Sequence, residues 1–262
     1  MRSNTLFWGF VLIAAGALFL LSNLGIIQVN VWNLIWPLVL IALGLSVLLR
    51  TVFRRPSTAE TVSIPLSGAE QAVVRINHGA GELNMSSGAG EGVLLEGSFA
   101  GGINHDERRD GNTVKVNLRM PSLVFPFFWA PGDSLNWDVH LSPRIALVFY
   151  LETGANRARI DLSDLLVNEL RFKSGASATD LVLPENAGKT DVRIESGAAS
   201  LNIRIPTGVA AQIRSESGLS SINVDRNRFP KTGGVYRSED YDTAPNKADI
   251  RIQTGVGSVQ IS

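Results

Sequence analysis

The feature that most constrains the fold of this chain is a short phrase that recurs six times. Each copy has a glycine flanked by alternating apolar residues, as in LRFKSGASATDLVL, VRIESGAASLNIRI and AQIRSESGLSSINV. The six anchor glycines are Gly79, Gly154, Gly175, Gly197, Gly218 and Gly255. The four central copies are separated by 21, 22 and 21 residues. A fixed period in this range is typical of a solenoid, in which each unit buries its apolar face against its neighbours.

The apolar positions around each glycine have the spacing of a β-strand. The repeat has 24 positions that lie five and three residues before, or four and six residues after, a glycine, and all but Ser215 and Thr179 are apolar. Apolar residues two apart indicate half-buried strands. Each glycine is expected at a tight turn, where it supplies either a positive φ or a crowded backbone position. The repeat predicts a single-stranded, right-handed β-helix of about 21 residues per coil, with a sandwich of repeated hairpins as the alternative.

The first 55 residues predict a helical hairpin in a membrane. Residues 6–27 and 31–49 each supply about 20 apolar residues, the length that spans a bilayer as a helix. A cleaved signal peptide is the alternative for the first span, but no small-residue cleavage site follows it. Arginines at positions 2, 50, 54 and 55 flank the hairpin, and its short loop has no Lys or Arg. The positive-inside rule therefore predicts that both termini are cytoplasmic.

Small residues in the first span, among them Gly9 and Gly16, would allow two helices to approach closely. Packing within the hairpin explains them without a further partner. Neither span contains a charged residue, which argues against a proton relay or an ion pathway.

The composition of the rest of the chain excludes several functions. Residues 56–262 carry 20 basic and 24 acidic side chains without a basic run, which argues against a nucleic-acid partner. The absence of cysteine excludes disulfides, thiolate metal sites and thiol nucleophiles. No pair of the three histidines has metal-ligand spacing, and the acidic residues of the repeats are scattered. We therefore expect no enzyme, no cofactor, no metal and no small-molecule substrate.

The domain after the membrane segment is predicted to be interrupted twice. A linker at 56–60 leads into a β-domain at 61–262, with insertions at 121–136 and 225–247. Further strands are expected at Thr61–Leu66, Val93–Phe99 and Thr113–Met120, with a polar loop between the last two. The 225–247 insertion is rich in charge and is expected to be a surface loop. The last repeat, which ends almost at Ser262, is expected to be the final coil.

The segment 121–132, PSLVFPFFWAPG, is neither a regular strand nor a helix. Its large apolar residues include Phe125, Phe127, Phe128 and Trp129. One interpretation is a cap that covers an open end of the solenoid, since an uncovered end would aggregate. The other is an exposed patch that docks on the membrane surface or on a partner protein.

Two parts of the sequence resemble a known family. The paired spans, FWGFVLIAAGALFLLSNLGI and WNLIWPLVLIALGLSVLLR, resemble the LiaI/LiaF-type transmembrane region of bacterial envelope proteins. The stretch WDVHLSPRIALVFYLETGANRARIDLSDLLVNELRFKSGAS resembles the LiaF-like C-terminal, or toastrack, β-domains. The resemblance implies a membrane-anchored accessory protein of the cell-envelope stress response. The chain departs from LiaF in its single helical hairpin and in the 121–132 segment.

We therefore expect a two-span protein of the bacterial inner membrane whose cytoplasmic β-helix acts by protein–protein contact. Its partners would be other envelope-stress signalling proteins or copies of itself. One alternative is a structural scaffold whose β-helices stack end to end, which the uncapped C-terminal repeat favours. A weaker alternative is an extracytoplasmic glycan-binding domain, which requires the reverse topology.

Overall fold

The computed structural model describes Pro37, Leu40, Ile41 and residues 59–121 and 135–262. The chain divides into two compact units, Met1–Pro56 and Ser57–Ser262. The three described residues of the first unit are helical, and among the described residues no helix is long and apolar enough to cross a membrane. Apart from these three residues, the spans expected at 6–27 and 31–49 lie outside the described part of the chain.

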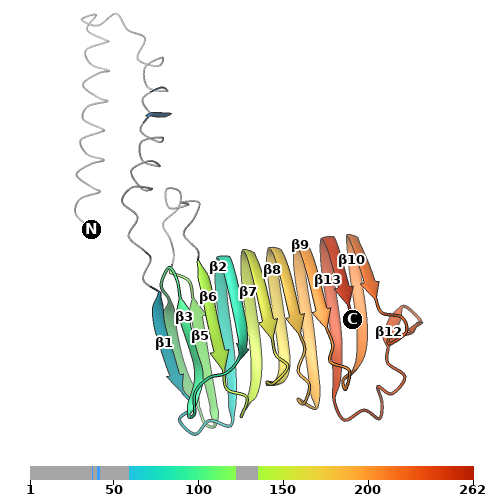
Figure 1. The fold of residues 1–262 in the computed structure, drawn as a ribbon, viewed down its shortest axis with the longest axis horizontal. Helices are drawn as coiled ribbons and strands as arrows, with labels where there is room; N and C mark the ends of the chain where they lie inside the picture. Colours follow the sequence, from blue (N-terminus) through green and yellow to red (C-terminus); the bar gives the residue numbers. More distant parts are fainter. Residues whose placement is uncertain (1–36, 38–39, 42–58, 122–134) are drawn as a thin grey trace, which may run out of the picture. The chain divides into compact units, whose positions relative to one another are not determined.

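Six long strands form the repeating part of the second unit (Figure 1). They are β2 (Gln71–Ser87), β7 (Ala146–Asp161), β8 (Leu166–Val182), β9 (Lys189–Arg204), β10 (Ala210–Val224) and β13 (Lys247–Ile261). Each contains one anchor glycine, where the strand bends into two legs; we call this bend the corner. Both legs pair in parallel with the same neighbouring strand, so each glycine lies opposite another glycine. Parallel pairing of repeats is the arrangement of a β-solenoid and not of repeated hairpins.

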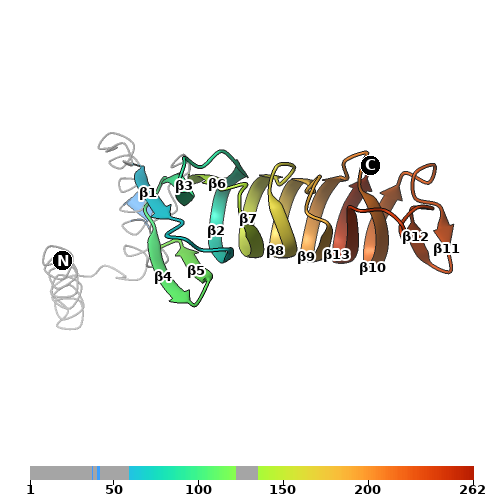
Figure 2. The same ribbon diagram turned by 90° about the horizontal axis from the view of Figure 1, so that it is seen from below.

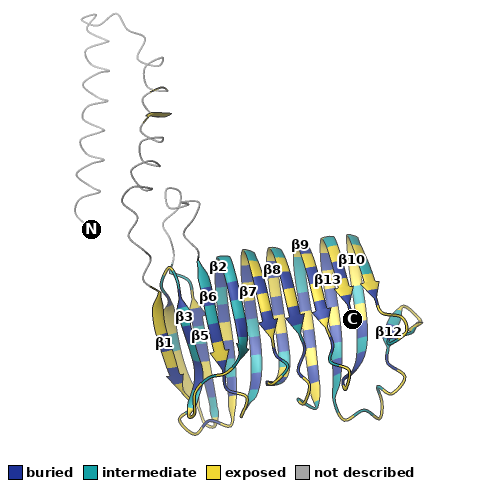
Figure 3. Cartoon of the chain, viewed as in Figure 1, coloured by how far each residue is buried: buried dark blue, intermediate teal, exposed yellow. Residues whose placement is uncertain are grey.

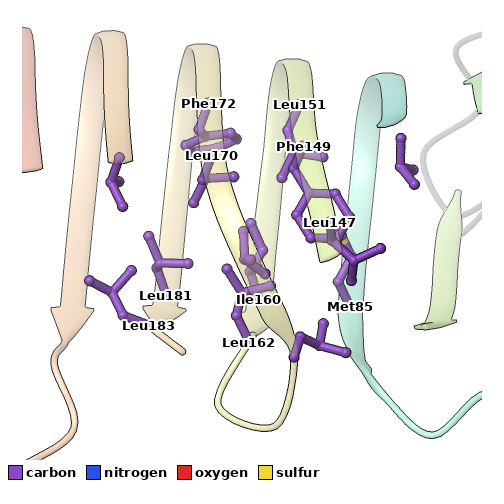
Figure 4. Packing of buried hydrophobic residues seen from close by; sticks show 14 of the residues in the cluster. Met85, Leu147, Phe149, Leu151, Ile160, Leu162, Leu170, Phe172, Leu181 and Leu183 are labelled. Atoms are coloured by element: carbon purple, nitrogen blue, oxygen red, sulfur yellow. The ribbon is translucent and has the colours of Figure 1, made fainter. Parts of the chain in front are cut away.

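The core lies between the two legs of the bent strands. Of the 24 positions that define the repeat, all but Ser215 and Ile222 are buried. Buried and exposed residues alternate along both legs (Figure 3), because successive side chains of a strand point to opposite faces. Side chains such as Phe149 on β7 and Phe172 on β8 fill the space between the legs (Figure 4). Burying one side chain of this size contributes about 1.5–3 kcal/mol.

One coil of the solenoid is divided at its corner. β5 (Thr113–Arg119) pairs in parallel with the first leg of β2, and β6 (Asn136–Leu141) pairs in parallel with the second leg. In β2 the step from Asn77 to Glu82 is 5 residues, whereas the matching step from Arg119 to Asn136 is 17. β5 and β6 are therefore the two legs of one coil, and 12 additional residues replace its glycine corner.

The strand order differs from the order of the repeats in the sequence. The sheet runs β1-β3-β6-β2-β7-β8-β9-β13-β10-β12-β11, so β13 lies between β9 and β10. The prediction that the C-terminal repeat is the final coil is wrong. β10 lies one coil position further from β9 than the next repeat would, and the chain then returns so that β13 fills the position between them. This removes the support that an uncapped β13 gave to end-to-end stacking.

The insertion after β10 covers part of the end of the core and is not simply a surface loop. It contains the short strands β11 (Lys231–Thr232) and β12 (Val235–Arg237), and Phe229 and Tyr236 are buried. The Arg228 guanidinium donates hydrogen bonds to the carbonyl oxygens of Ile205, Pro206 and Val209. The charged composition of this insertion suggested a surface loop and did not reveal that Phe229 and Tyr236 close the core beside the first leg of β10.

Short antiparallel strands cover the other end of the solenoid (Figure 2). β1 (Glu60–Pro65) pairs with β3 (Val93–Phe99), which pairs with β6, and β4 (Asn104–Asp110) pairs with β5. The prediction of a polar loop between the strands at 93–99 and 113–120 is therefore wrong for residues 104–110, which form β4. This strand lies at the sheet edge with no buried residue, so it lacks the apolar alternation that would have predicted it.

Candidate functional site

The six corners stack into one straight edge. A Cβ placed on Gly154 would lie 2.3 Å from the backbone oxygen of Gly79. A Cβ on Gly255 would lie 2.6 Å from the Gly197 oxygen, and one on Gly197 would lie 2.8 Å from the Gly175 oxygen. Such distances are shorter than real contacts allow. None of the six anchor glycines has a positive φ. At these three corners glycine is therefore needed because the backbones approach closely, and not because of an unusual φ.

A groove of about 810 Å³ runs along this edge beside the glycines. It is lined by glycines and by the hydroxyl residues that precede them. The side chains two residues before the glycines also line it: Glu152, Lys173, Glu195, Gln253 and Glu216. Lys173 Nζ lies 3.0 Å from Glu195 Oε2, and Gln253 Nε2 donates to Glu216 Oε2 at 3.1 Å. The groove is shallow, polar and mixed in charge, which suits contact with an extended polar surface.

Hydroxyl groups form a ladder just inside the corner. Ser174 Oγ donates to Ser196 Oγ at 2.8 Å, and Ser177 Oγ donates to Ser174 Oγ at 3.0 Å. Thr179, one of the two polar exceptions of the repeat, donates to Ser177 Oγ at 3.3 Å. Its hydroxyl is buried but satisfied, which explains how a polar residue is tolerated at a core position.

The corner is less completely satisfied where β2 meets β7. His78 is 1% exposed, its Nε2–H donates to the Leu135 carbonyl oxygen at 3.1 Å, and its ring lies 5.1 Å from that of Trp137. Burial lowers the pKa of His78 from its ordinary value of 6.5. Among the described residues, His78 Nδ1, Thr153 Oγ1 and both amide atoms of Asn156 have no hydrogen-bond partner. Buried polar atoms without hydrogen-bond partners destabilise a fold. This corner is therefore polar, and its hydrogen bonding is incomplete.

The segment that replaces the glycine corner of the divided coil begins and ends at the same edge. A Cβ on Gly79 would lie 3.8 Å from Met120 Sδ, and one on Gly81 would lie 2.2 Å from the Leu135 oxygen. Gly81 has φ +118°, so a side chain there would also be strained. The aromatic residues Phe125, Phe127, Phe128 and Trp129 lie outside the described residues, as do Gly9 and Gly16.

The register also aligns residues that the sequence keeps far apart. Arg75, Tyr150, Arg171, Arg193, Arg251 and Arg214 face solvent in one column across the first legs. Tyr150 lies under two of them, 4.7 Å from Arg75 and 5.4 Å from Arg171. The absence of a basic run in the sequence did not predict this column. Adding the 21–22-residue period to the position of one arginine would have found most of it.

The arginine column does not form a basic patch, because an acidic column runs beside it. Glu169, Asp191 and Asp249 are register partners on neighbouring strands. Asp249 lies 3.4 Å from Arg214 Nη1 and 3.9 Å from Arg251 Nε. This face is striped with opposite charges and is suited to solvent more than to a polyanion.

The described residues offer a polar groove and a few exposed apolar side chains at the corner edge. They contain no group of three or more His, Cys, Asp or Glu side chains that could hold a metal ion. The large apolar residues exposed in the second unit's described part are Leu219 on β10, 83% exposed, and its register partner Val256 on β13, 54% exposed. Both directly follow an anchor glycine and lie at the corner edge.

Two family models match the chain. The model for the N-terminal domain of toast_rack, DUF2154, matches residues 53–204, and the model for the LiaI-LiaF-like transmembrane region matches residues 6–48. None of the curated proteins that were compared matches the chain. The second match identifies a membrane-associated protein, and neither family is known as a family of enzymes.

A comparison with solved structures finds a protein of similar fold. A candidate cell adhesion protein from Clostridium sporogenes ATCC 15579 is 22% identical, with a TM-score of 0.69, over 78% of this chain and 97% of that one. At this identity the likeness concerns the fold alone. A candidate adhesin (BF0245) from Bacteroides fragilis NCTC 9343 is 9% identical, with a TM-score of 0.27, over 79% of this chain and 99% of that one.

Proposed function

Because the chain belongs to the family defined by the N-terminal domain of toast_rack, DUF2154, we propose that it is an accessory protein of the bacterial envelope-stress response. A two-span hairpin at 6–27 and 31–49, packed through Gly9 and Gly16, holds it in the inner membrane. Its β-domain is a right-handed solenoid on the cytoplasmic side. The protein acts by contact with another membrane protein and needs neither cofactor nor substrate.

The observation that carries this proposal is the divided coil. Met120 and Leu135, the described residues near the two ends of its additional segment, lie at the corner edge, next to Gly79 and Gly81. The end of the solenoid at which segment 121–132 begins and ends already has covering strands within the described residues: β1, β3 and β4. The need for a cap, which motivated one interpretation of segment 121–132, is therefore weaker. We assign Phe125, Phe127, Phe128 and Trp129 to docking.

Pro121, the residue at which the docking segment begins, lies close to the start of β1. Glu60, the first residue of β1, accepts a hydrogen bond from the Ile103 amide at 3.2 Å. A Cβ on Gly102 would lie 3.6 Å from Pro121 Cγ and 3.7 Å from Glu60 Oε2. The base of the segment and the start of β1 are therefore neighbours. Such a position favours a partner that is itself at the membrane.

The cytoplasmic orientation is tested with single cysteines, because the chain has no cysteine of its own. Ser200→Cys, on an exposed position of β9, should resist a membrane-impermeant maleimide in intact cells and react after lysis. A cysteine placed in the loop between the spans, such as Asn23→Cys, should react in intact cells. The opposite pattern would reverse the topology and favour glycan binding outside the cell.

The docking role is tested by removing the segment. Replacing residues 120–135 with Thr-Gly-Ala-Asn, the corner sequence of β7 at 153–156, should give an ordinary coil. In a strain that lacks the wild-type protein, this variant should reach the membrane but fail to restore the response of an envelope-stress reporter. Arg193→Ser, an exposed substitution away from the corner, should restore it. A fully active variant without the segment would exclude the docking role.

A further inference from the structure

Most of the outer edge of β10 has no strand beside it. Of the residues of β10, only Gln212 and Ile213 pair with β12. Within the described part of the chain, no strand pairs with the outer edge from Arg214 to Val224. An open edge of this length presents backbone donors and acceptors to which another strand can add.

The side chains of β10 are incompletely covered along the same stretch. Ser215 and Ile222 occupy core positions but are half-buried, whereas the equivalent positions of the other bent strands are buried. Leu219 at the corner is 83% exposed. The edge therefore combines unpaired backbone with apolar side chains that lack a neighbour on one side.

We propose that this edge pairs with β10 of a second copy of the chain, forming a two-fold symmetric dimer. A two-fold axis makes the paired strands antiparallel and brings the same surface of both copies together. If the axis passes through the corner, the first leg of one β10 lies beside the second leg of the other. The two bent cross-sections then superimpose, and the sheet continues from one copy into the next.

Only one register of the two β10 strands places inward-facing side chains opposite inward-facing ones along the whole pairing. By register with the buried positions of β13, the inward positions are Ile213, Ser215 and Ser217 before the corner, and Ser220, Ile222 and Val224 after it. Ser217 is itself exposed, but it is the partner of the buried Thr254, whereas Gly218 and Leu219 both face outward. Residues opposite each other in an antiparallel pair must point to the same face. This condition holds throughout when Gly218 pairs with Leu219 of the other copy. Shifting by two residues in either direction places an inward residue opposite an outward one at the corner.

In this register Ile222 lies opposite Ser215 of the second copy. Both positions gain the neighbour that they lack in the single chain. The pairing extends from Arg214 to Asn223, and it ends where β12 already occupies the edge at Ile213. The two Leu219 side chains lie on either side of the axis and cover each other.

The other end of the solenoid explains why the association stops at two chains. The strands there are short, and β4 has the sequence NHDERRD, whose charges discourage further pairing. The two-fold axis also leaves both copies of Glu60 on the same side, because the start of β1 and the corners lie along one edge (Figure 1). Two chains anchored in one bilayer require this arrangement. The inference rests on the fold and is independent of the proposed envelope-stress role.

Disulfide formation in native membranes tests the dimer on the full chain. Leu219→Cys should give a covalent dimer on mild oxidation, because a disulfide requires Cα atoms about 4.4–6.8 Å apart and residue 219 lies next to the axis. Val256→Cys is the matched control: it is the register partner of Leu219 and also exposed, but one strand further from the axis in each copy. It should remain monomeric. Equal crosslinking of the two variants would indicate random collision and overturn the proposal.

A second pair of variants tests the register. Glu216 lies opposite Ser221 of the other copy, whereas Glu216 and its own symmetry mate lie five residues apart along the strand, about 17 Å. When Glu216→Cys and Ser221→Cys are carried by two differently tagged chains in one cell, a mixed dimer should form. Neither variant alone should crosslink. Crosslinking of Glu216→Cys with itself, or no mixed dimer, would exclude this pairing.

Discussion

At the scale of the residue, the corner glycines allow the coils to stack closely, because they have no Cβ. A Cβ on Gly154 would lie 2.3 Å from the Gly79 oxygen, whereas one on Gly175 would lie 3.2 Å from the Gly154 oxygen. Gly154→Ala should therefore lower the free energy of unfolding by about 1–3 kcal/mol, because a backbone must move. Gly175→Ala should cost less. Thermal unfolding of the purified full chain measures both.

The control for this series is Gly208→Ala. No atom lies within 4 Å of the position that its Cβ would occupy, and its φ is not positive. This variant should be as stable as the wild type or slightly more stable, because alanine restricts the unfolded chain. If all three variants behaved alike, the crowding at the corner would have no energetic weight.

His78 should make the stability of the domain depend on pH. Its pKa is lowered by burial from an ordinary value of 6.5, so below that pH the unfolded chain binds a proton more readily than the folded one. Stability should fall as the pH falls from 6.5 towards the lowered pKa, and level off below it. His78→Gln should flatten this part of the curve of melting temperature against pH. His105→Gln, at an exposed position, should leave the curve unchanged.

At the scale of the element, the position of β13 changes which repeat is internal. Ile252 on β13 is buried between β9 and β10, whereas Ile222 on β10 is half-buried at the end of the array. Ile252→Ala should lower the free energy of unfolding by about 2–5 kcal/mol, and Ile222→Ala by clearly less. Denaturant unfolding compares them. Stacking in sequence order would give the reverse ranking, because Ile222 would then be internal.

The divided coil gives a second prediction at this scale. β5 and β6 already pair with β2 in the registers of the two legs of one coil. Replacing residues 120–135 with the corner of β7 should therefore join them without moving either strand. The variant should keep its far-ultraviolet circular dichroism and melt cooperatively. A variant that does not fold would mean that the segment is part of the fold, and it would restore the cap interpretation.

The sequence predicted the elements of this domain better than their order. The period of the glycines and the alternation of apolar and polar residues around Phe149 or Leu181 follow from local burial. The repeat could therefore be recognised in the sequence. The return of β13 depends on how the 225–246 connection packs, through buried Phe229 and Tyr236, and no local period reports such a contact. The two legs β5 and β6 were separately visible as apolar alternation, but their common corner was hidden by 12 additional residues.

The candidate site shows the same limit. The anchor glycines predicted the corner edge directly, because each glycine marks one bend. The groove beside them, and the arginine column from Arg75 to Arg214, exist only once the coils are in register. Residues that occupy the same place in successive repeats become neighbours in space. The sequence of a repeat protein should therefore be compared repeat by repeat as well as along the chain.

At the scale of the whole molecule, the two ends of the solenoid set the size of any assembly. A head-to-tail filament requires each β10 edge to meet the opposite end of the next chain, near β4. A chain with both Leu219→Cys and His105→Cys, the latter exposed on β4, distinguishes the two assemblies. A filament would give a ladder of oxidised products that joins position 219 of one chain to position 105 of the next. The two-fold dimer should give one product of two chains, joined through position 219, and His105→Cys alone should remain monomeric. The outcome decides whether this fold works at the membrane as a closed pair or as an extending scaffold.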